Sequence, residues 1–254
     1  MENVVHLAVE RGVATVTLDS PRNRNALSRQ LVEELSGHLE AVTADEAVRA
    51  VLLTHTGSVF CAGADLGEAA AEGMEAGSRR LIDLLTLIVE LPKPVVAMVT
   101  GKARAGGLGV LGACDIVLAD AGGDYAFTEA RLGLSPAMIS LTLLPRLDPR
   151  AAGQYFITGE TFDAAEAERI GLITRAVPAP GLAEAVESVL DGLRLASPQG
   201  LAESKRLVTE PVRRALAERG AEMATLSARL FSSPEAREGM SAFLQKRPPS
   251  WAVR

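Results

Sequence analysis

The spacing of apolar and polar residues along the chain predicts an alternation of short strands and helices. The first segment, "VVHLAVERGVATVTLDSP" (residues 4–21), contains two short alternating runs around Arg11-Gly12, which is typical of a β-hairpin. A helix is predicted next, because apolar residues recur at helical spacing from Leu31 to Val42 and Ser28 can cap the N-terminus. The continuous apolar run "VRAVLLTHTG" (48–57) then predicts a buried strand.

The middle of the chain continues the same order. A helix is predicted over about 79–91 and a strand over "PVVAMVTG" (94–101), with Pro92 and Pro94 fixing where the helix ends and the strand begins. Further short strands or sheet edges are predicted at "DIVLAD" (115–120), "YAFTEARLGL" (125–134) and "GLITRAV" (171–177). After "VPAPG" (177–181) the pattern is almost wholly helical, and the part from about Pro198 is predicted to be a helical appendage whose last helix opens at Ser233-Pro234-Glu235.

One pattern occurs twice: a strand, a turn, a glycine-containing loop and a helix. It is found at "LLTHTG…CAGAD" and again at "VAMVTG…AGGLG". Apolar residues make up 48% of the chain and aromatic residues only 4%, which suits helices packed on Val/Ile/Leu strands better than a β-sandwich. We therefore expect an α/β fold.

Composition narrows the function classes. The net charge of -6 disfavours a nucleic-acid-binding protein, which needs a basic face to neutralise phosphates. No apolar run reaches the roughly 20 residues needed to cross a bilayer, and the start lacks the order of a signal peptide, so we expect no membrane association and a cytoplasmic protein. Reduced thiols are expected at Cys61 and Cys114. The histidines show no metal-ligand spacing, so no metal site is predicted.

The glycine run "RAGGLGVLG" (104–112) contains the spacing of a dinucleotide-binding fingerprint, Gly107-x-Gly109-x-x-Gly112. In that fold the strand runs directly into the first glycine, whereas here the strand ends near Val99 and the segment 101–105 intervenes before the glycines. We favour a different role. Two glycine turns that follow neighbouring strands can each aim one backbone N–H at an anionic oxygen, and two converging donors form an oxyanion hole for a thioester or acyl enolate.

At this point the sequence resembles the crotonase superfamily, the enoyl-CoA hydratases and isomerases. The resemblance covers nearly the whole chain and rests on ordered motifs: "SPRNRNALS" (20–28), "FCAGADL" (60–66), "KPVVAMVTGKARAGGLG" (93–109), "FTEARLGLSP" (127–136), "ITGETFDAAEAERIGLITRAV" (157–177) and "EGMSAFLQKRPP" (238–249). It implies a crotonase-like spiral of ββα repeats with a C-terminal helical region. Residues 1–197 would form the acyl-CoA-binding catalytic core, and residues 198–254 a helical region that assembles trimers or hexamers.

The resemblance also implies site residues. The backbone N–H groups of Ala64 and Gly106 would hold the thioester carbonyl, and Glu129 would act as base and proton shuttle. Coenzyme A would enter as part of the substrate, in fatty acid metabolism, with no separate cofactor. Family hydratases usually carry two catalytic glutamates, and here Gly109 stands where the first is usual, while Thr128 replaces a proline before the second.

This departure leaves several activities open. Two carboxylates share the work of adding water to a 2-enoyl-CoA, whereas one suffices to move a proton between C2 and C4, which favours an isomerase. The segment "EARLGLSPAMIS" (129–140), however, resembles a branch that includes methylglutaconyl-CoA-type hydratases and also lacks the first glutamate. We place hydratase slightly ahead of isomerase, with a catalytically silent acyl-CoA binder as a third reading. Outside the motif, Glu129 could instead form a salt bridge with Arg131 or Arg104.

Coenzyme A needs an adenine slot and cations near its phosphates. The resemblance assigns these contacts to Arg22, Arg24, Ala26, Ala62, Asp65 and Leu66, and more weakly to Phe243 and Lys246 near the C-terminus. Solvated loop arginines, a core phenylalanine and a surface lysine are the plainer alternatives. Glu68 is interpreted as a helix N-terminal charge. The segment "AGSRRLIDLLTLIVE" (76–90) is expected to supply one wall of the acyl pocket.

Overall fold

A computed structural model of the 254-residue chain describes residues 2–68 and 75–253. Two sheets are present in this part of the chain. The larger sheet contains, in spatial order, β1 (Val5–Glu10), β2 (Val13–Leu18), β3 (Ala50–His55), β5 (Val95–Val99), β7 (Ile116–Asp120) and β10 (Arg175–Val177). The smaller sheet contains β4 (Val59–Cys61), β6 (Lys102–Arg104), β8 (Asp124–Ala126) and β9 (Phe162–Asp163).

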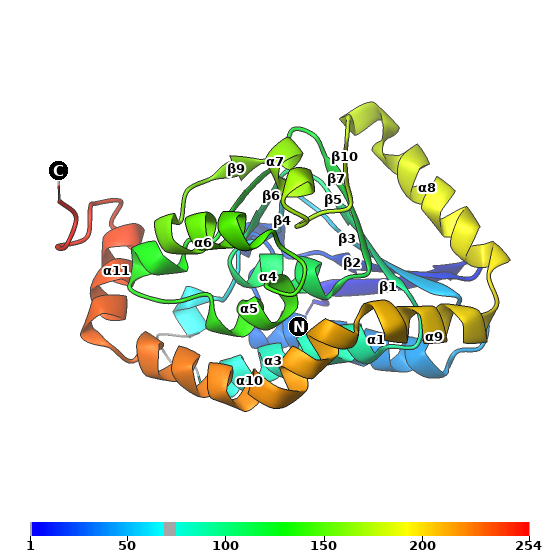
Figure 1. The fold of residues 1–254 in the computed structure, drawn as a ribbon, viewed down its shortest axis with the longest axis horizontal. Helices are drawn as coiled ribbons and strands as arrows, with labels where there is room; N and C mark the ends of the chain where they lie inside the picture. Colours follow the sequence, from blue (N-terminus) through cyan, green and yellow to red (C-terminus); the bar gives the residue numbers. More distant parts are fainter. Residues whose placement is uncertain (1, 69–74, 254) are drawn as a thin grey trace.

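The helices surround these sheets (Figure 1). They are α1 (Arg29–Ala44), α3 (Glu75–Glu90), α4 (Gly106–Ala113), α5 (Ala137–Leu143), α6 (Pro149–Thr158), α7 (Ala164–Arg169), α8 (Ala179–Leu195), α9 (Pro198–Val208), α10 (Glu210–Phe231) and α11 (Pro234–Leu244), with short 3-10 turns η1 (Pro21–Asn23) and η2 (Glu129–Leu132). None of the helices in the described ranges is long and apolar enough to span a bilayer.

The first two predicted elements are confirmed. β1 and β2 pair antiparallel around Arg11-Gly12, and α1 begins after Ser28, whose Oγ accepts a hydrogen bond from the Leu31 N–H at 3.3 Å. The apolar residues at helical spacing all face the core: Leu31, Val32, Leu35, Leu39 and Val42. Burying each such side chain contributes about 1.5–3 kcal/mol, so this face fixes how α1 lies against the sheet.

The recurring strand-turn pattern occurs three times, whereas the sequence predicts it at two sites. Each unit places one strand in the larger sheet, turns at a glycine, and places the next strand in the smaller sheet: β3 with β4, β5 with β6, and β7 with β8. The turns lie at Gly57, Gly101 and Gly123. Because all three units run in the same direction, β4, β6 and β8 are parallel neighbours.

The larger sheet is covered on both faces, which explains its continuous apolar strands. Alternate residues point to opposite sides: Val51 and Val95 face the layer that contains α1, α3 and α4, whereas Ala50 and Val96 face α8. In Figure 1, α8 runs alone along its face of the sheet.

The helices that follow residue 197 pack on the rest of the same chain. α10 lies against α3 and α5, and α11 lies against η2. A buried lysine ties α9 to the sheet, because Lys205 Nζ lies 2.9 Å from Asp115 Oδ2 and donates to the carbonyls of Ile88 and Lys93. The division at residue 197 and the trimerisation role of 198–254 stay predictions.

Two predicted strands are shorter than expected. The strand predicted over 125–134 ends at Ala126 in the structure, since the chain then turns and the N–H of Leu134 donates to the Glu129 carbonyl at 2.9 Å. The strand predicted over 171–177 forms only from Arg175. The helix predicted over about 79–91 already begins at Glu75. The first difference matters for function, because it places Glu129 on a turn at the end of β8 and not within a strand.

Candidate active site

Three loops leave the same edge of the smaller sheet. β4 leads into Ala62–Ala64, β6 leads into Ala105 and Gly106, and β8 leads into the turn that carries Glu129. The carboxyl ends of parallel strands meet at one edge, so the fold brings Ala64, Gly106 and Glu129 to that edge from positions far apart in the sequence.

The first two of these loops touch. A Cβ placed on Gly106 would lie 3.5 Å from Gly63 Cα and 3.8 Å from the Ala64 nitrogen. Gly63 adopts φ +93°, a conformation that favours glycine, and its carbonyl accepts a hydrogen bond from the Leu27 N–H at 2.8 Å. The N–H groups of Ala64 and Gly106 have no hydrogen-bond partner among the described residues. Two backbone N–H groups without a partner among the described residues therefore lie on adjacent loops.

Backbone strain accompanies this arrangement. Ala105, immediately before α4, has φ 45° and ψ -120°, a conformation that costs an alanine roughly 1–3 kcal/mol. Its N–H donates to the Ala126 carbonyl of the neighbouring strand at 3.3 Å, which holds it in place. The strained residue turns the chain so that Gly106 becomes the first residue of α4, where its N–H points away from the helix.

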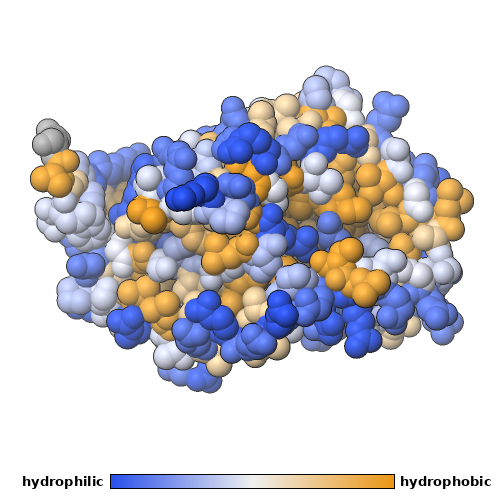
Figure 2. Space-filling model, viewed as in Figure 1, coloured by the Kyte–Doolittle hydropathy of each residue, from blue (hydrophilic) through white to orange (hydrophobic). Residues whose placement is uncertain are grey.

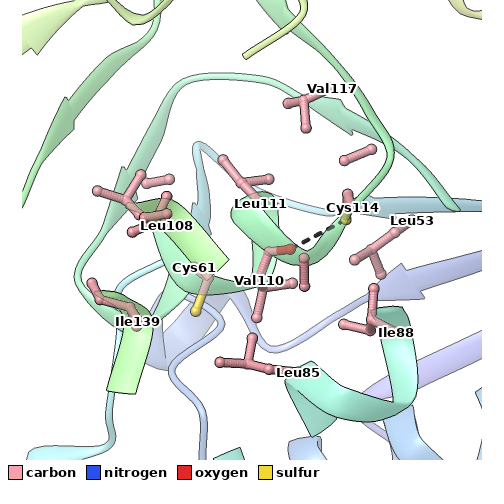
Figure 3. Close-up of a cluster of buried hydrophobic side chains, with 14 of the residues drawn as sticks. Leu53, Cys61, Leu85, Ile88, Leu108, Val110, Leu111, Cys114, Val117 and Ile139 are labelled. Carbon is pink, nitrogen blue, oxygen red and sulfur yellow. Dashed lines mark hydrogen bonds between the residues drawn. The ribbon is translucent and has the colours of Figure 1, made fainter. Parts of the chain in front are cut away.

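The glycines of α4 allow this helix to pack closely on its neighbours. All of α4 is buried, and a Cβ on Gly107 would lie 2.7 Å from Cys61 Cβ. A Cβ on Gly109 would meet Ile139 of α5, with Ile139 Cβ at 2.8 Å. Figure 3 shows Cys61 and Ile139 beside α4. The position where the family usually carries its first glutamate is thus closed by Ile139.

Glu129 has the properties of a proton-transfer group. Glu129 as a residue is only 9% exposed, and its Oε2 is buried without a hydrogen-bond partner among the described residues. Burial raises the pKa of the Glu129 carboxyl to about 7, and the hydrogen bond from its own backbone N–H only partly opposes this. A carboxyl with a pKa near neutrality can both take and give a proton at physiological pH.

The alternative of a structural salt bridge at Glu129 is wrong. Arg104 pairs with the Asp124 carboxylate and also donates to the Asp124 carbonyl at 2.7 Å. Arg131 Nε donates to the Thr158 carbonyl at 2.8 Å. Both arginines that could have neutralised Glu129 are bound elsewhere.

The loop that carries Arg22 and Arg24, which is predicted to contact coenzyme A, is hydrogen-bonded to the loop that carries Ala64. The Ala62 N–H donates to the Arg24 carbonyl at 3.1 Å. Ala26 is buried, whereas the side chains of Arg22 and Arg24 are exposed and make no ion pair with the described residues. This places the two exposed guanidinium groups on a loop directly adjoining the Ala64 donor.

Sequence reasoning missed Asn25, which holds this loop in shape. Asn25 is fully buried at φ 52°; its Oδ1 accepts from the Ser20 N–H, and its Nδ2 donates to the carbonyls of Thr56 and Val59. An asparagine between charged and small residues in "NRNALS" was the available signal, because asparagine tolerates the left-handed conformation better than most residues.

Asp65 and Glu68 cap helices. Asp65 Oδ1 accepts from the N–H groups of Gly67 and Glu68, at the start of the helical turn that begins at Leu66. Glu68 Oε2 accepts from the Arg29 N–H at the start of α1, at 2.8 Å. Glu68 is thus a helix N-terminal charge, as predicted: it lies in the first turn of its own helical segment, and it also accepts a hydrogen bond at the start of α1.

Phe243 and Lys246 lie at the end of α11 with exposed side chains, and Phe243 is 56% exposed. The plainer reading of Phe243 as a core aromatic is therefore wrong. The helix that carries Phe243 packs against η2 and α10. Their predicted role in coenzyme A binding stays a prediction.

Comparison with known proteins decides the family. The model of the enoyl-CoA hydratase/isomerase family matches residues 8–254. The chain belongs to the enoyl-CoA hydratase/isomerase family. A crystal structure of an enoyl-CoA hydratase from Mycobacterium avium is 47% identical, with a TM-score of 0.92 over 99% of this chain and 100% of that one.

More distant family members share the same fold. An enoyl-CoA hydratase/isomerase from Pseudoalteromonas atlantica is 29% identical, with a TM-score of 0.88 over 98% of this chain and 100% of that one. A Thermus thermophilus protein is 36% identical over 249 residues, which is 95% of this chain and 98% of that protein. The predicted crotonase-like α/β fold is confirmed.

Proposed function

We propose that this chain is an enoyl-CoA hydratase that adds water to a 2-enoyl-CoA through an enolate held by the N–H groups of Ala64 and Gly106. The observation that carries the proposal is the Glu129 carboxyl: buried, without a hydrogen-bond partner for Oε2 among the described residues, and with a pKa of about 7, at the same edge as the two backbone donors. The family membership supplies the acyl-CoA thioester as substrate class.

In this mechanism one carboxyl does both proton transfers. The Glu129 carboxylate takes a proton from water as the water oxygen bonds to C3, and the electron pair of the double bond moves to the thioester oxygen as an enolate. The enolate then collapses as C2 takes the proton back from the Glu129 carboxylic acid. Each backbone donor to the enolate oxygen contributes about 3–4 kcal/mol to the transition state. Because the first step needs the carboxylate, turnover should rise with pH through about 7.

A second candidate is a one-base isomerase. Ile139 closes the position at Gly109 where a second carboxylate would stand, so the described site offers Glu129 alone for proton transfer. A single carboxyl can remove a proton from C2 of a 3-enoyl-CoA, which gives a dienolate with its oxygen at the same two backbone donors, and return the proton to C4. The two activities share every residue of the site and differ in whether water reaches C3.

Mass spectrometry separates these activities. Purified protein is incubated with matched 2-enoyl-CoA and 3-enoyl-CoA substrates, beside Glu129→Gln and the exposed-site control Glu33→Gln. Water addition to the 2-enoyl substrate supports the hydratase, and double-bond migration without water addition replaces it by the isomerase. Acyl-CoA binding without either reaction would make the chain a silent binder. Turnover unchanged in Glu129→Gln would contradict the role of Glu129.

Self-association as a trimer or hexamer is part of the proposal. Large apolar side chains are exposed on α8 and α9, with Leu195 at 90%, Leu207 at 76% and Val208 at 70%. Figure 2 shows apolar residues gathered on the face beside α8. Exposed apolar surface of this kind is typical of an interface. Light scattering on the eluting protein should give the mass of three or six chains, and the mass of one chain would refute this part.

A further inference from the structure

The last helix of the chain rests directly on the turn that carries Glu129. Gly239, in the middle of α11, faces the backbone of Leu132: a Cβ at this position would contact the Leu132 carbonyl oxygen and lie 2.8 Å from Leu132 Cα. From the other side, a Cβ on Gly133 would lie 2.7 Å from the carbonyl carbon of Glu235, in the first turn of α11. The two backbones meet through two glycines, with no side chain between them.

A contact of this kind transmits small displacements. A long side chain at an interface can change rotamer to absorb a shift, but two backbones in contact move together. Any added volume at Gly239 must therefore displace either α11 or η2, the turn whose first residue is Glu129. Gly133 also has φ +72°, which lets the chain reverse at the point of contact.

Side-chain hydrogen bonds stabilise α11 itself. Ser233 Oγ accepts from the Ala236 N–H at 3.1 Å and caps the helix N-terminus. Near the C-terminus, Arg247 donates to both carboxylate oxygens of Glu238, at 2.7 and 2.9 Å. These bonds stabilise α11 as a helix, and this helix packs against η2 although about a hundred residues separate the two along the chain.

We infer that Gly239 and Gly133 are positioning residues, through which α11 holds the Glu129 carboxyl in its buried place at the sheet edge. The inference rests on the proposed function, because it takes Glu129 as the proton-transfer group. It gives the C-terminal helix a part in proton transfer within its own chain, separate from any role in assembly.

Gly239→Ala tests the inference against Gly192→Ala, a control at an exposed position of α8 where an added Cβ meets nothing within 4 Å. Misplacement of a reacting group by about 1 Å can cost on the order of 100-fold in rate, so we expect kcat of Gly239→Ala to fall at least about 10-fold while KM changes little. Because the displaced carboxyl gains water, the pH at which kcat rises should move down by about one unit or more. Gly192→Ala should match the unmodified protein in kcat and in pH profile.

A kcat and pH profile unchanged in a folded Gly239→Ala variant would overturn the inference. If this variant does not fold by circular dichroism, Ser233→Ala decides, since it removes only the N-cap and loosens the first turn of α11 against Gly133. The inference then predicts a kcat lowered by about 3-fold or more with the same downward pH shift, and it fails if neither changes. Glu129→Gln in the same assay separates the two hypotheses: if that variant stays active, the proposed function fails first.

Discussion

Burial of Glu129 makes the protein less stable as pH rises, and Glu129→Gln should remove that dependence. The carboxyl has a pKa of about 7 in the folded chain and 4.5 as its ordinary value, so the folded state binds the proton more tightly than the unfolded state. The stabilisation is fully present below about pH 4.5 and is lost as pH rises through about 7. At pH 8 the buried Glu129 carboxyl is mostly ionised, and the folded protein has lost the stabilisation that the bound proton gave it.

The magnitude follows from the two pKa values. At roughly 1.4 kcal/mol for each pH unit, the difference between about 7 and 4.5 corresponds to about 3 kcal/mol in the free energy of unfolding. About 2.5 kcal/mol of this falls between pH 5 and pH 8. The buried glutamine has its own costs, such as an unpaired amide, but these do not change with pH and cancel in the comparison.

Urea unfolding at about pH 5 and about pH 8, at one fixed protein concentration, measures the effect. The free energy of unfolding of Glu129→Gln, taken relative to that of the unmodified protein, should be about 2.5 kcal/mol higher at the higher pH than at the lower pH. Glu33→Gln, the same substitution at an exposed position of α1, should show a change below about 0.5 kcal/mol. Equal stability differences for Glu129→Gln at both pH values would refute the reasoning that burial sets the pKa of Glu129.

Further predictions concern the loops around the site. Gly109→Ala should lower the free energy of unfolding by about 1–3 kcal/mol, because the added Cβ overlaps Ile139, and an unchanged melting temperature would contradict this. Ala105→Gly should leave the free energy of unfolding unchanged or raise it by up to about 1 kcal/mol, since relief of strain offsets the added entropy of the unfolded chain. A clearly lower free energy of unfolding in urea would contradict this. Asn25→Ala should destabilise the protein by about 2–3 kcal/mol and raise KM for acyl-CoA, because the loop loses three hydrogen bonds. Unchanged stability and unchanged KM would show that the loop does not depend on this side chain. Arg24→Ala should raise KM at least about 3-fold with kcat unchanged, and an unchanged KM would remove this residue from the coenzyme A contacts.

The elements that the sequence predicted well are those with local signals. The β1–β2 hairpin and α1 each follow from residues within one segment: alternating apolar runs, a two-residue turn, and a Ser28 cap before helical periodicity. The strand-turn pattern was visible at two of its three sites. The third, at β7 and β8, was missed because the two strands were predicted separately, although the paired glycines at 122–123 mark the turn between them.

The features that could not be predicted depend on contacts between distant segments. The segment over 125–134 looks like a strand locally, but η2 forms because the chain turns back on itself after Phe127 and packs against α11. Ile139 closes the space at Gly109 from another helix, and no pattern in either segment reports that the two meet. The pKa of Glu129 has the same origin, since burial is set by the whole fold.

The central claim is that Glu129 moves a proton at C2 of a bound thioester, and α-proton exchange tests it most directly. The protein is incubated in D2O with a saturated acyl-CoA, which offers an α proton but no double bond to hydrate, and deuterium at C2 is followed by mass spectrometry. The account predicts incorporation with the unmodified protein and with Glu33→Gln, and none above background with Glu129→Gln. Exchange at an equal rate in Glu129→Gln would contradict it.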